Sequence, residues 1–358
     1  MRTVFVHDWL VSFRGGEKVL EALTSLSPQS PVYTLFYDSQ SMPKTLRQKD
    51  IRAPWYLRPF IKIRKGLLPI FPFIVESWPG TKHDFVISTS SCVTKSVKAK
   101  KHLCYIHSPM RYIWDQESVY LEPLQKYPLL PFIIRQINKV LRWWDSKTSS
   151  RVDQFICNSN FIAKRVKTYY GRDSVVIHPP IESELFEFPF AEKKPYLVAA
   201  GALVWYKRFD IAIQACEKLG IDLVIAGNGP YLQELKKLAG PRTTFMSDLN
   251  DADFRKVIAE AQALVFPGIE DFGMIAVESM ALGTPVIAYK DGGALDFIQD
   301  QTGRFFEEPT AESLIGALEL FKKEDFSNDS LRAYAKNFSR ESFLSKIEVE
   351  IAKLKERP

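Results

Sequence analysis

Two glutamates flank a predicted helix start near residue 273. Glu270 and Glu278 lie on either side of Gly273, in a segment that follows the apolar run at residues 263–266. A helix that starts there leaves free backbone N–H groups and the positive end of its dipole over residues 272–276, which favours a phosphate or diphosphate. Glu278, one or two turns into the helix, can accept hydrogen bonds from the paired hydroxyls of a ribose. Glu270, in the preceding loop, points toward whatever lies beyond the phosphate.

Other loops that follow apolar runs carry residues suited to the same ligand. Gly15 and Gly16 precede the first predicted helix, where the absence of Cβ lets the backbone approach a phosphate closely. Lys207 offers an ammonium that can neutralise the charge of a departing diphosphate. His107 directly follows the run at residues 103–106, and a glycine-rich turn covers residues 227–229.

These loops depend on a repeated pattern of strands and helices. Short apolar runs alternate with amphipathic segments, at residues 3–6, 32–35, 85–88, 103–106, 154–158, 175–177, 196–201, 222–226, 244–246, 263–266 and 285–288. Such alternation predicts an α/β protein with parallel sheets covered by helices on both faces. Ligands in these sheets bind at the carboxyl ends of the strands.

An acidic, proline-flanked connection at residues 181–194 is the best domain boundary. We therefore predict two doubly wound, Rossmann-like domains facing each other across a cleft. The N-terminal domain covers residues 1–185 and the C-terminal domain residues 186–339. Residues 340–358 form a closing helix that packs back toward the N-terminal domain.

Composition limits the class of protein. The chain has 358 residues, of which 46% are hydrophobic and 25% charged, as in folded globular proteins. Its four cysteines form no CxxC pair, which argues against a zinc cluster or disulfide framework and for a reducing compartment. The sequence shows neither an apolar stretch of about 20 residues nor a signal peptide, so a cytoplasmic protein is expected.

Basic residues are concentrated in the first half of the chain. Residues 1–189 hold 27 Lys and Arg against 16 Asp and Glu, a net charge of +11, whereas the remainder has a net charge of −5. Residues 44–65 include eight basic residues and one acid, Asp50, and an apolar run at residues 67–75 follows. This combination suits an anionic membrane surface. A solvated basic face followed by a core element is the alternative; nucleic acid is not expected, because no binding motif accompanies the charge.

The string from Gly268 to Pro285 resembles the signature of the retaining nucleotide-sugar glycosyltransferases of glycosyltransferase family 4, which have the GT-B fold. The family's E-x7-E motif matches Glu270 and Glu278. By this resemblance, Glu270 contacts the donor sugar and Glu278 the ribose. The resemblance also implies donor-binding roles for Gly15, Gly16, Gly201, Lys207, Arg208, Gly227, Asn228, Gly229, Phe272, Gly273, Met274, Ile275 and Ala276.

The string from His107 to Asp115 resembles bacterial mannosyltransferases of surface-polysaccharide assembly. His107 matches the histidine that the family places near the sugar, so the resemblance implies catalytic roles for His107, Glu270 and Lys207. Arg111 and Tyr112 would lie on the acceptor side. The chain departs from the family at Ala202, where an arginine is usual, and therefore lacks half of the expected cationic pair.

The resemblance implies a retaining hexosyltransferase that acts on a glycan or lipid-linked glycan at the inner face of the cell membrane. Mannose from GDP-mannose is favoured over a UDP-sugar. Neither a cofactor nor a metal is expected, because no Asp-x-Asp motif of the metal-using type follows a strand. Two alternatives remain: a soluble sugar or metabolite as acceptor, and a catalytically silent nucleotide-sugar-binding subunit, which the absence of the arginine suggests.

Overall fold

A computed structural model describes residues 2–78, 83–117, 121–124, 127 and 129–357. The chain divides into two compact units, residues 1–179 with 343–358, and residues 180–342. Each unit contains one parallel sheet with helices on both faces, so the α/β fold class predicted from the alternating pattern is confirmed.

Seven strands form the sheet of the first unit in the order β3-β2-β1-β4-β5-β6-β7. Their bounds are β1 Thr3–His7, β2 Val32–Thr34, β3 Ile51–Arg52, β4 Phe85–Ser90, β5 Lys101–Ile106, β6 Gln154–Cys157 and β7 Ser174–Val176. The main helices are α1 Gly15–Thr24, α2 Lys44–Arg47, α3 Phe71–Glu76, α5 Leu130–Thr148, α6 Asn160–Tyr170 and α14 Arg340–Glu356, with a 3-10 helix, η2, at Trp55–Leu67. The short strand β3 was not predicted from the sequence.

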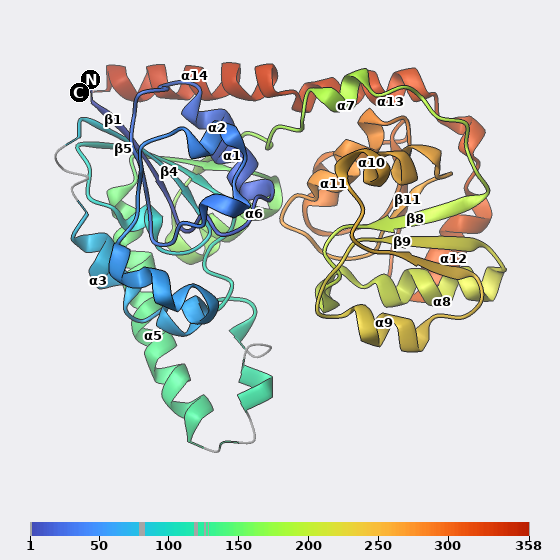
Figure 1. The fold of residues 1–358 in the computed structure, drawn as a ribbon, viewed down its shortest axis with the longest axis horizontal. Helices are drawn as coiled ribbons and strands as arrows, with labels where there is room; N and C mark the ends of the chain where they lie inside the picture. The colour runs from blue at the N-terminus through green and yellow to red at the C-terminus, as the bar shows by residue number, and fades with distance from the viewer. Residues whose placement is uncertain (1, 79–82, 118–120, 125–126, 128, 358) are drawn as a thin grey trace. The chain divides into compact units, whose positions relative to one another are not determined.

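Both faces of the first sheet are buried. Successive side chains of a strand point to opposite faces, so Phe5 of β1 packs with α1 and α14, whereas Val4 and Val6 pack with η2, α3 and α5. Figure 1 shows α1 and α14 on one side of β1 and β4, and α3 and α5 on the other. Phe343, Ile347 and Leu354 of α14 belong to the core of this unit.

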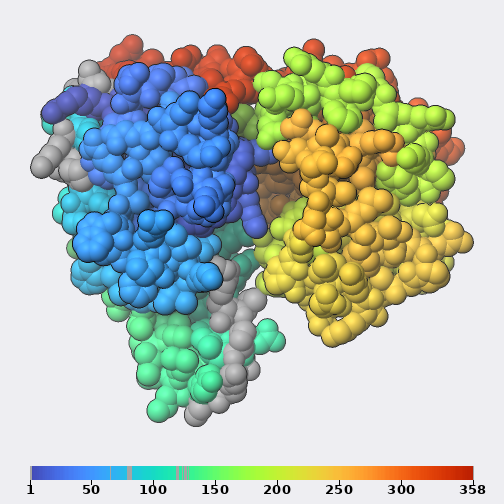
Figure 2. All heavy atoms as spheres, in the orientation of Figure 1, coloured from blue at the N-terminus to red at the C-terminus, as the bar shows by residue number. Residues whose placement is uncertain are grey.

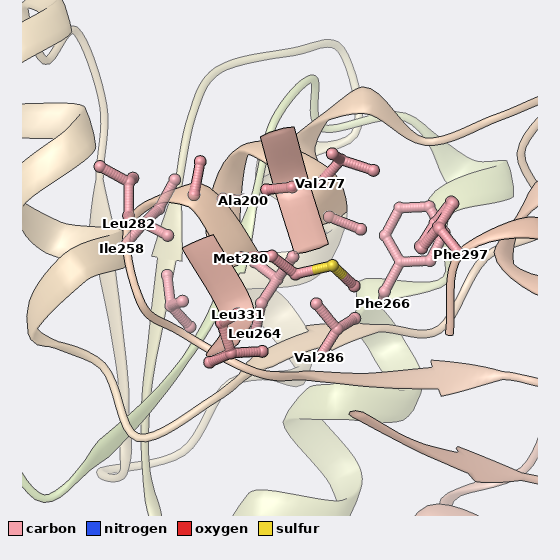
Figure 3. Packing of buried hydrophobic residues seen from close by; sticks show 14 of the residues in the cluster. Ala200, Ile258, Leu264, Phe266, Val277, Met280, Leu282, Val286, Phe297 and Leu331 are labelled. Atoms are coloured by element: carbon pink, nitrogen blue, oxygen red, sulfur yellow. The ribbon is translucent and has the colours of Figure 1, made fainter. Parts of the chain in front are cut away.

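The sheet of the second unit has the order β10-β9-β8-β11-β12-β13. Its strands are β8 Tyr196–Ala200, β9 Asp222–Ala226, β10 Thr243–Met246, β11 Leu264–Phe266, β12 Val286–Tyr289 and β13 Gly303–Phe306. Its helices are α7 Glu184–Glu187, α8 Phe209–Leu219, α9 Leu232–Leu238, α10 Asp251–Glu260, α11 Met274–Ala281, α12 Ala311–Leu320 and α13 Asn328–Ala335. Leu197 and Ala199 of β8 pack toward α8 and α12, and Val198 and Ala200 toward α10, α11 and α13. Figure 3 shows Met280 of α11 close to Leu264 and Val286 of the sheet.

The apolar run at residues 67–75 was expected to face a membrane surface together with the basic segment, but most of it is buried. Leu68, Phe71 and Val75 are buried beneath the first sheet, because their spacing of three and four residues places them on one side of a helical segment. Ile70 and Phe73 remain exposed. Most of this run is therefore core, as the alternative interpretation proposed.

Helix α5 is fixed to the first unit by a buried ion pair. Lys95 Nζ lies 2.9 Å from Asp145 Oδ1, and both side chains are almost completely buried. Trp114 Nε1 and the Tyr170 hydroxyl each donate to Asp145 Oδ2 at 2.8 Å. One carboxylate therefore connects α5 to α6 and to the loop after β5. Among the described residues, no helix is both long and apolar enough to cross a bilayer.

We expect Lys95→Ala to lower the free energy of unfolding by about 3–5 kcal/mol, because it leaves a buried carboxylate unpaired. Lys98→Ala is the matched control: Lys98 pairs with Glu76 at 2.9 Å on the surface, where such pairs contribute about 0–1 kcal/mol. Denaturant unfolding of both variants measures the difference. If both variants lose the same free energy of unfolding, the buried Lys95–Asp145 pair contributes no more to stability than the surface pair of Lys98.

Candidate functional site

The strand order of the second sheet reverses between β8 and β11. The chain runs outward from β8 to β9 and β10, then returns to start β11 on the other side of β8. The loops after β8 and β11 therefore diverge in opposite directions, and crevices of this kind bind ligands in open parallel sheets. Lys207 follows β8 and Glu270 follows β11, so the topology brings these two predicted site residues together.

Lys207 and Glu270 form an ion pair at this point. Lys207 Nζ lies 2.9 Å from Glu270 Oε1, and both side chains are largely buried. Lys207 ends a short 3-10 helix, η7 Trp205–Lys207. The ammonium also approaches Gly201, where an added Cβ would lie 2.8 Å from Nζ. Gly201 has a φ of +121°, so its missing side chain gives Lys207 both space and the required turn.

Helix α11 starts beside this pair. Gly273 caps the helix with a φ of +98°, and a Cβ there would lie 2.4 Å from the Phe266 ring. The amide of Ala276 already donates to the Gly273 carbonyl at 3.0 Å. The amides of Met274 and Ile275, in the first turn, have no acceptor within the helix. The helix start thus combines available donors with the positive end of the helix dipole.

The other predicted donor residues of this unit line neighbouring loops. Glu278 is half-buried on α11, and Phe272 is packed into the core. Residues 227–229 follow β9 and pack tightly against the loop after β8. Arg208 is also paired with a carboxylate, because its guanidinium donates to Asp210 at 3.1 Å, and its side chain is more exposed than that of Lys207.

The strand order of the first sheet also reverses, between β1 and β4. Asp8, just after β1, is buried, and its carboxylate accepts hydrogen bonds from the amides of Ser91, Val93 and Thr94 at 2.6, 2.9 and 3.1 Å. This carboxylate fixes the loop after β4. Gly15 and Gly16 open α1, and a Cβ on Gly16 would lie 3.8 Å from the ring of His7, the last residue of β1.

His107 lies next to the first turn of α1. Its Nε2 is buried without a hydrogen-bond partner in the described part of the chain, 3.5 Å from where a Cβ on Gly16 would lie. Burial lowers the pKa of His107 to about 3, and the nearby His7 adds to this effect. The imidazole is therefore neutral near pH 7. Its Nε2 can either donate a hydrogen bond to a hydroxyl group or accept one from it, depending on the tautomer.

His7 and Glu17 lie beside Gly16 and were not among the predicted site residues. His7 Nδ1 pairs with the Thr89 hydroxyl at 2.6 Å, and His7 Nε2 lies 3.7 Å from Glu17 Oε1. Burial raises the pKa of Glu17, but hydrogen bonds with His7 and with backbone amides outweigh burial and lower it. The sequence places His7 at the end of a strand and Glu17 after two glycines, and this position is the only signal of their proximity.

Arg111 and Tyr112 follow His107 in the loop after β5. Both are half-buried, and Tyr112 packs against the core beneath the first sheet. No group of three or more metal-ligating side chains occurs among the residues that the structure describes.

Residues 180–338 match the family described as Glycosyl transferases group 1. The matched residues lie in the second unit, residues 180–342. Human alpha-1,3/1,6-mannosyltransferase ALG2 is 25% identical over 299 residues, which cover 72% of this chain and 69% of the human protein. An uncharacterized glycosyltransferase of Methanocaldococcus jannaschii is 31% identical over 123 residues, 32% of each chain.

Solved structures extend the likeness to both units. Anabaena HepE, crystallised in complex with UDP, has a TM-score of 0.72 at 15% identity and covers 99% of this chain and 100% of its own. WaaG, a glycosyltransferase involved in lipopolysaccharide biosynthesis, has a TM-score of 0.62 at 15% identity. The match covers 96% of this chain and 98% of WaaG. The chain therefore has the GT-B fold.

We expect Lys207→Ala to weaken GDP binding by about 1.5–3 kcal/mol, because it removes a charge-assisted contact and leaves Glu270 unpaired. Isothermal titration calorimetry measures the loss. Lys218→Ala, which changes an exposed lysine of α8 in the same unit, should bind GDP like the parent.

Ala202→Arg tests the same site in the opposite direction. An arginine in the loop after β8 should tighten GDP binding by supplying the missing second cation. If Lys207→Ala binds GDP as tightly as the parent does, the diphosphate must bind away from Lys207.

Proposed function

We propose that the protein is a retaining hexosyltransferase of glycosyltransferase family 4 that uses a nucleoside diphosphate sugar. The Lys207–Glu270 pair beside the start of α11, inside a group 1 glycosyl transferase domain, carries this proposal. The ammonium and the amides of the first helical turn would hold the diphosphate. Glu278 would bind the ribose, and Glu270 the hydroxyls of the donor sugar.

The proposed reaction needs no group beyond the substrates and these residues. The bond between the anomeric carbon and the diphosphate breaks while the acceptor oxygen bonds to that carbon from the same face, which retains the configuration. The departing phosphate takes the acceptor proton. Lys207 and the α11 start stabilise the negative charge that grows on the diphosphate. Neutral His107 would hydrogen-bond a sugar hydroxyl, with Arg111 and Tyr112 on the acceptor side.

Mannose from GDP-mannose is the proposed donor, because the string from His107 to Asp115 resembles mannosyltransferases and the human relative is named as one. The bound UDP of HepE makes a UDP-sugar the competing donor. The proposed acceptor is a glycan or lipid-linked glycan of bacterial surface-polysaccharide synthesis.

A donor screen tests this function. The protein is incubated with GDP-, UDP- and ADP-sugars, and release of the nucleoside diphosphate is followed. We expect release from GDP-mannose, and Glu278→Ala should raise the donor Kd by about 10- to 150-fold through loss of hydrogen bonds to a charged group. Glu348→Ala, on α14, is the control. Release from none of the sugars would refute the proposal.

We further propose peripheral attachment of the first unit to an anionic membrane surface, on the cytoplasmic side. Trp55, Phe60 and Ile63 of η2 are exposed beside the exposed Lys62. The Arg64 guanidinium instead donates to the Ile61 carbonyl at 2.8 Å, and the side chain of Lys65 lies outside the described residues. Exposed cations and apolar groups together suit a lipid headgroup region.

Helix α5 adds a second apolar and basic face that the sequence did not indicate. Phe132, Ile133, Val140 and Trp143 are exposed on it. Its exposed charges are Arg135, Lys139 and Lys147, and its single acid is the buried Asp145. Figure 2 shows the blue atoms of η2 and α3 adjoining the green atoms of α5, and these elements share one hydrophobic cluster.

Replacing three of these cations should weaken attachment. In the variant Lys62→Gln/Arg135→Gln/Lys139→Gln, we expect binding to anionic vesicles to fall by up to about 3 kcal/mol, since each cation near the surface contributes about 1 kcal/mol. Vesicle sedimentation at several salt concentrations measures this. The control Lys164→Gln/Lys167→Gln/Lys236→Gln changes exposed lysines of other helices. Equal binding of the parent to neutral and anionic vesicles would refute the electrostatic attraction.

A further inference from the structure

A pocket of about 470 Å³ opens in the first unit at the ends of β2 and β3. Its size falls within the range of about 300–1,000 Å³ that is typical of small-molecule sites. The segment after β2 and the segment that leads from β3 into η2 form its walls. The residues that matter here are Phe36, Asp38, Gln40, Trp55, Arg58 and Ile61.

One face of η2 lines this pocket. Trp55, Arg58 and Ile61 are three residues apart, and residues at this spacing align along a 3-10 helix. The rows on either side carry Phe60, Lys62 and Ile63 of the membrane-binding proposal, whereas its Trp55 lies in the row that lines the pocket. The same helix thus presents one row to the pocket, while Leu57 anchors it to the core and Phe60, Lys62 and Ile63 face the solvent.

The pocket wall is joined to the loop that leads to Gly15 and Gly16. The Leu10 amide donates to the Phe36 carbonyl at 2.8 Å, and the Asp38 amide donates to the Leu10 carbonyl at 2.8 Å. These two bonds make a parallel bridge between Leu10 and Tyr37. The pocket therefore lies at the same edge of the sheet as the glycine loop and is fixed to it by backbone bonds.

The lining chemistry favours a sugar ring over a diphosphate. Asp38 accepts hydrogen bonds from the Gln40 amide at 3.2 Å and from the Ser41 hydroxyl at 2.7 Å, so its carboxylate is held in place. A fixed carboxylate repels phosphate but accepts hydrogen bonds from hydroxyl groups. Gln40 and Arg58 supply donors. Trp55, with 85% of its surface exposed, offers a flat apolar face for stacking.

We propose that this pocket binds a hexose ring of the acceptor, stacked on Trp55 and hydrogen-bonded by Asp38, Gln40 and Arg58. The assignment of that sugar to the acceptor rests on the proposed glycosyltransferase function. A lipid-linked acceptor bound here has its sugar at the glycine-loop edge of the sheet and its lipid beside the exposed apolar groups of η2.

The test separates sugar binding from catalysis. Binding of methyl α-mannoside, methyl α-glucoside and methyl α-galactoside to the full chain is measured by NMR saturation transfer without donor. We expect at least one to bind, and Gln40→Ala/Arg58→Gln and Trp55→Ala each to weaken it at least 10-fold. Both sets of side chains are exposed, so the fold should persist, which the thermal unfolding midpoint checks.

Matched controls are Gln48→Ala and Lys164→Gln, whose exposed side chains lie outside the pocket; both should bind the sugar like the parent. GDP affinity should be the same in all variants. Sugar binding that is absent in the parent, or unchanged in both pocket variants, overturns the pocket assignment. Loss of GDP affinity in the pocket variants also overturns it, because the pocket would then belong to the donor. A failed donor screen with intact pocket binding refutes the transferase function alone.

Discussion

The reversal of strand order in each parallel sheet is the constraint on which the rest of the structure depends. In the second unit it separates the loops after β8 and β11, and Lys207 and Glu270 meet at 2.9 Å where those loops diverge. In the first unit it lies between β1 and β4, where the buried Asp8 holds the following loop by its amides. Polar groups that would be costly to bury elsewhere are paired at these two points.

Much of the fold follows from local sequence pattern, because buried parallel strands are short apolar runs separated by helices. The runs at residues 3–6 and 263–266 predicted β1 and β11, and the glycine at 273 predicted the start of α11. Strand β3 was missed, since two residues at a sheet edge, one of them Arg52, give no apolar signal. Helix α5 was missed because it exposes Phe132 and Trp143 while burying Asp145, the reverse of the usual pattern.

Only part of the candidate site could be predicted from the sequence, for a similar reason. Lys207 and Glu270 could each be named as site residues through their family motifs, but their ion pair was not predicted. His7 and Glu17 come together only because α1 returns along β1. The apolar run at residues 67–75 was expected beside the basic segment as a surface feature. Packing instead buries Phe71 and Val75, and exposed apolar groups lie within the basic segment itself, at Trp55, Phe60 and Ile63. Burial of this kind depends on tertiary contacts that composition does not encode.

The location of the diphosphate tests the central claim most directly. A crystal structure of the protein with bound GDP should show the diphosphate within hydrogen-bond distance of Lys207 Nζ and the amides of Met274 and Ile275, with the ribose hydroxyls on Glu278. A diphosphate bound in the first unit, or in the second unit away from Lys207, would contradict the claim that the loops after β8 and β11 form the donor site.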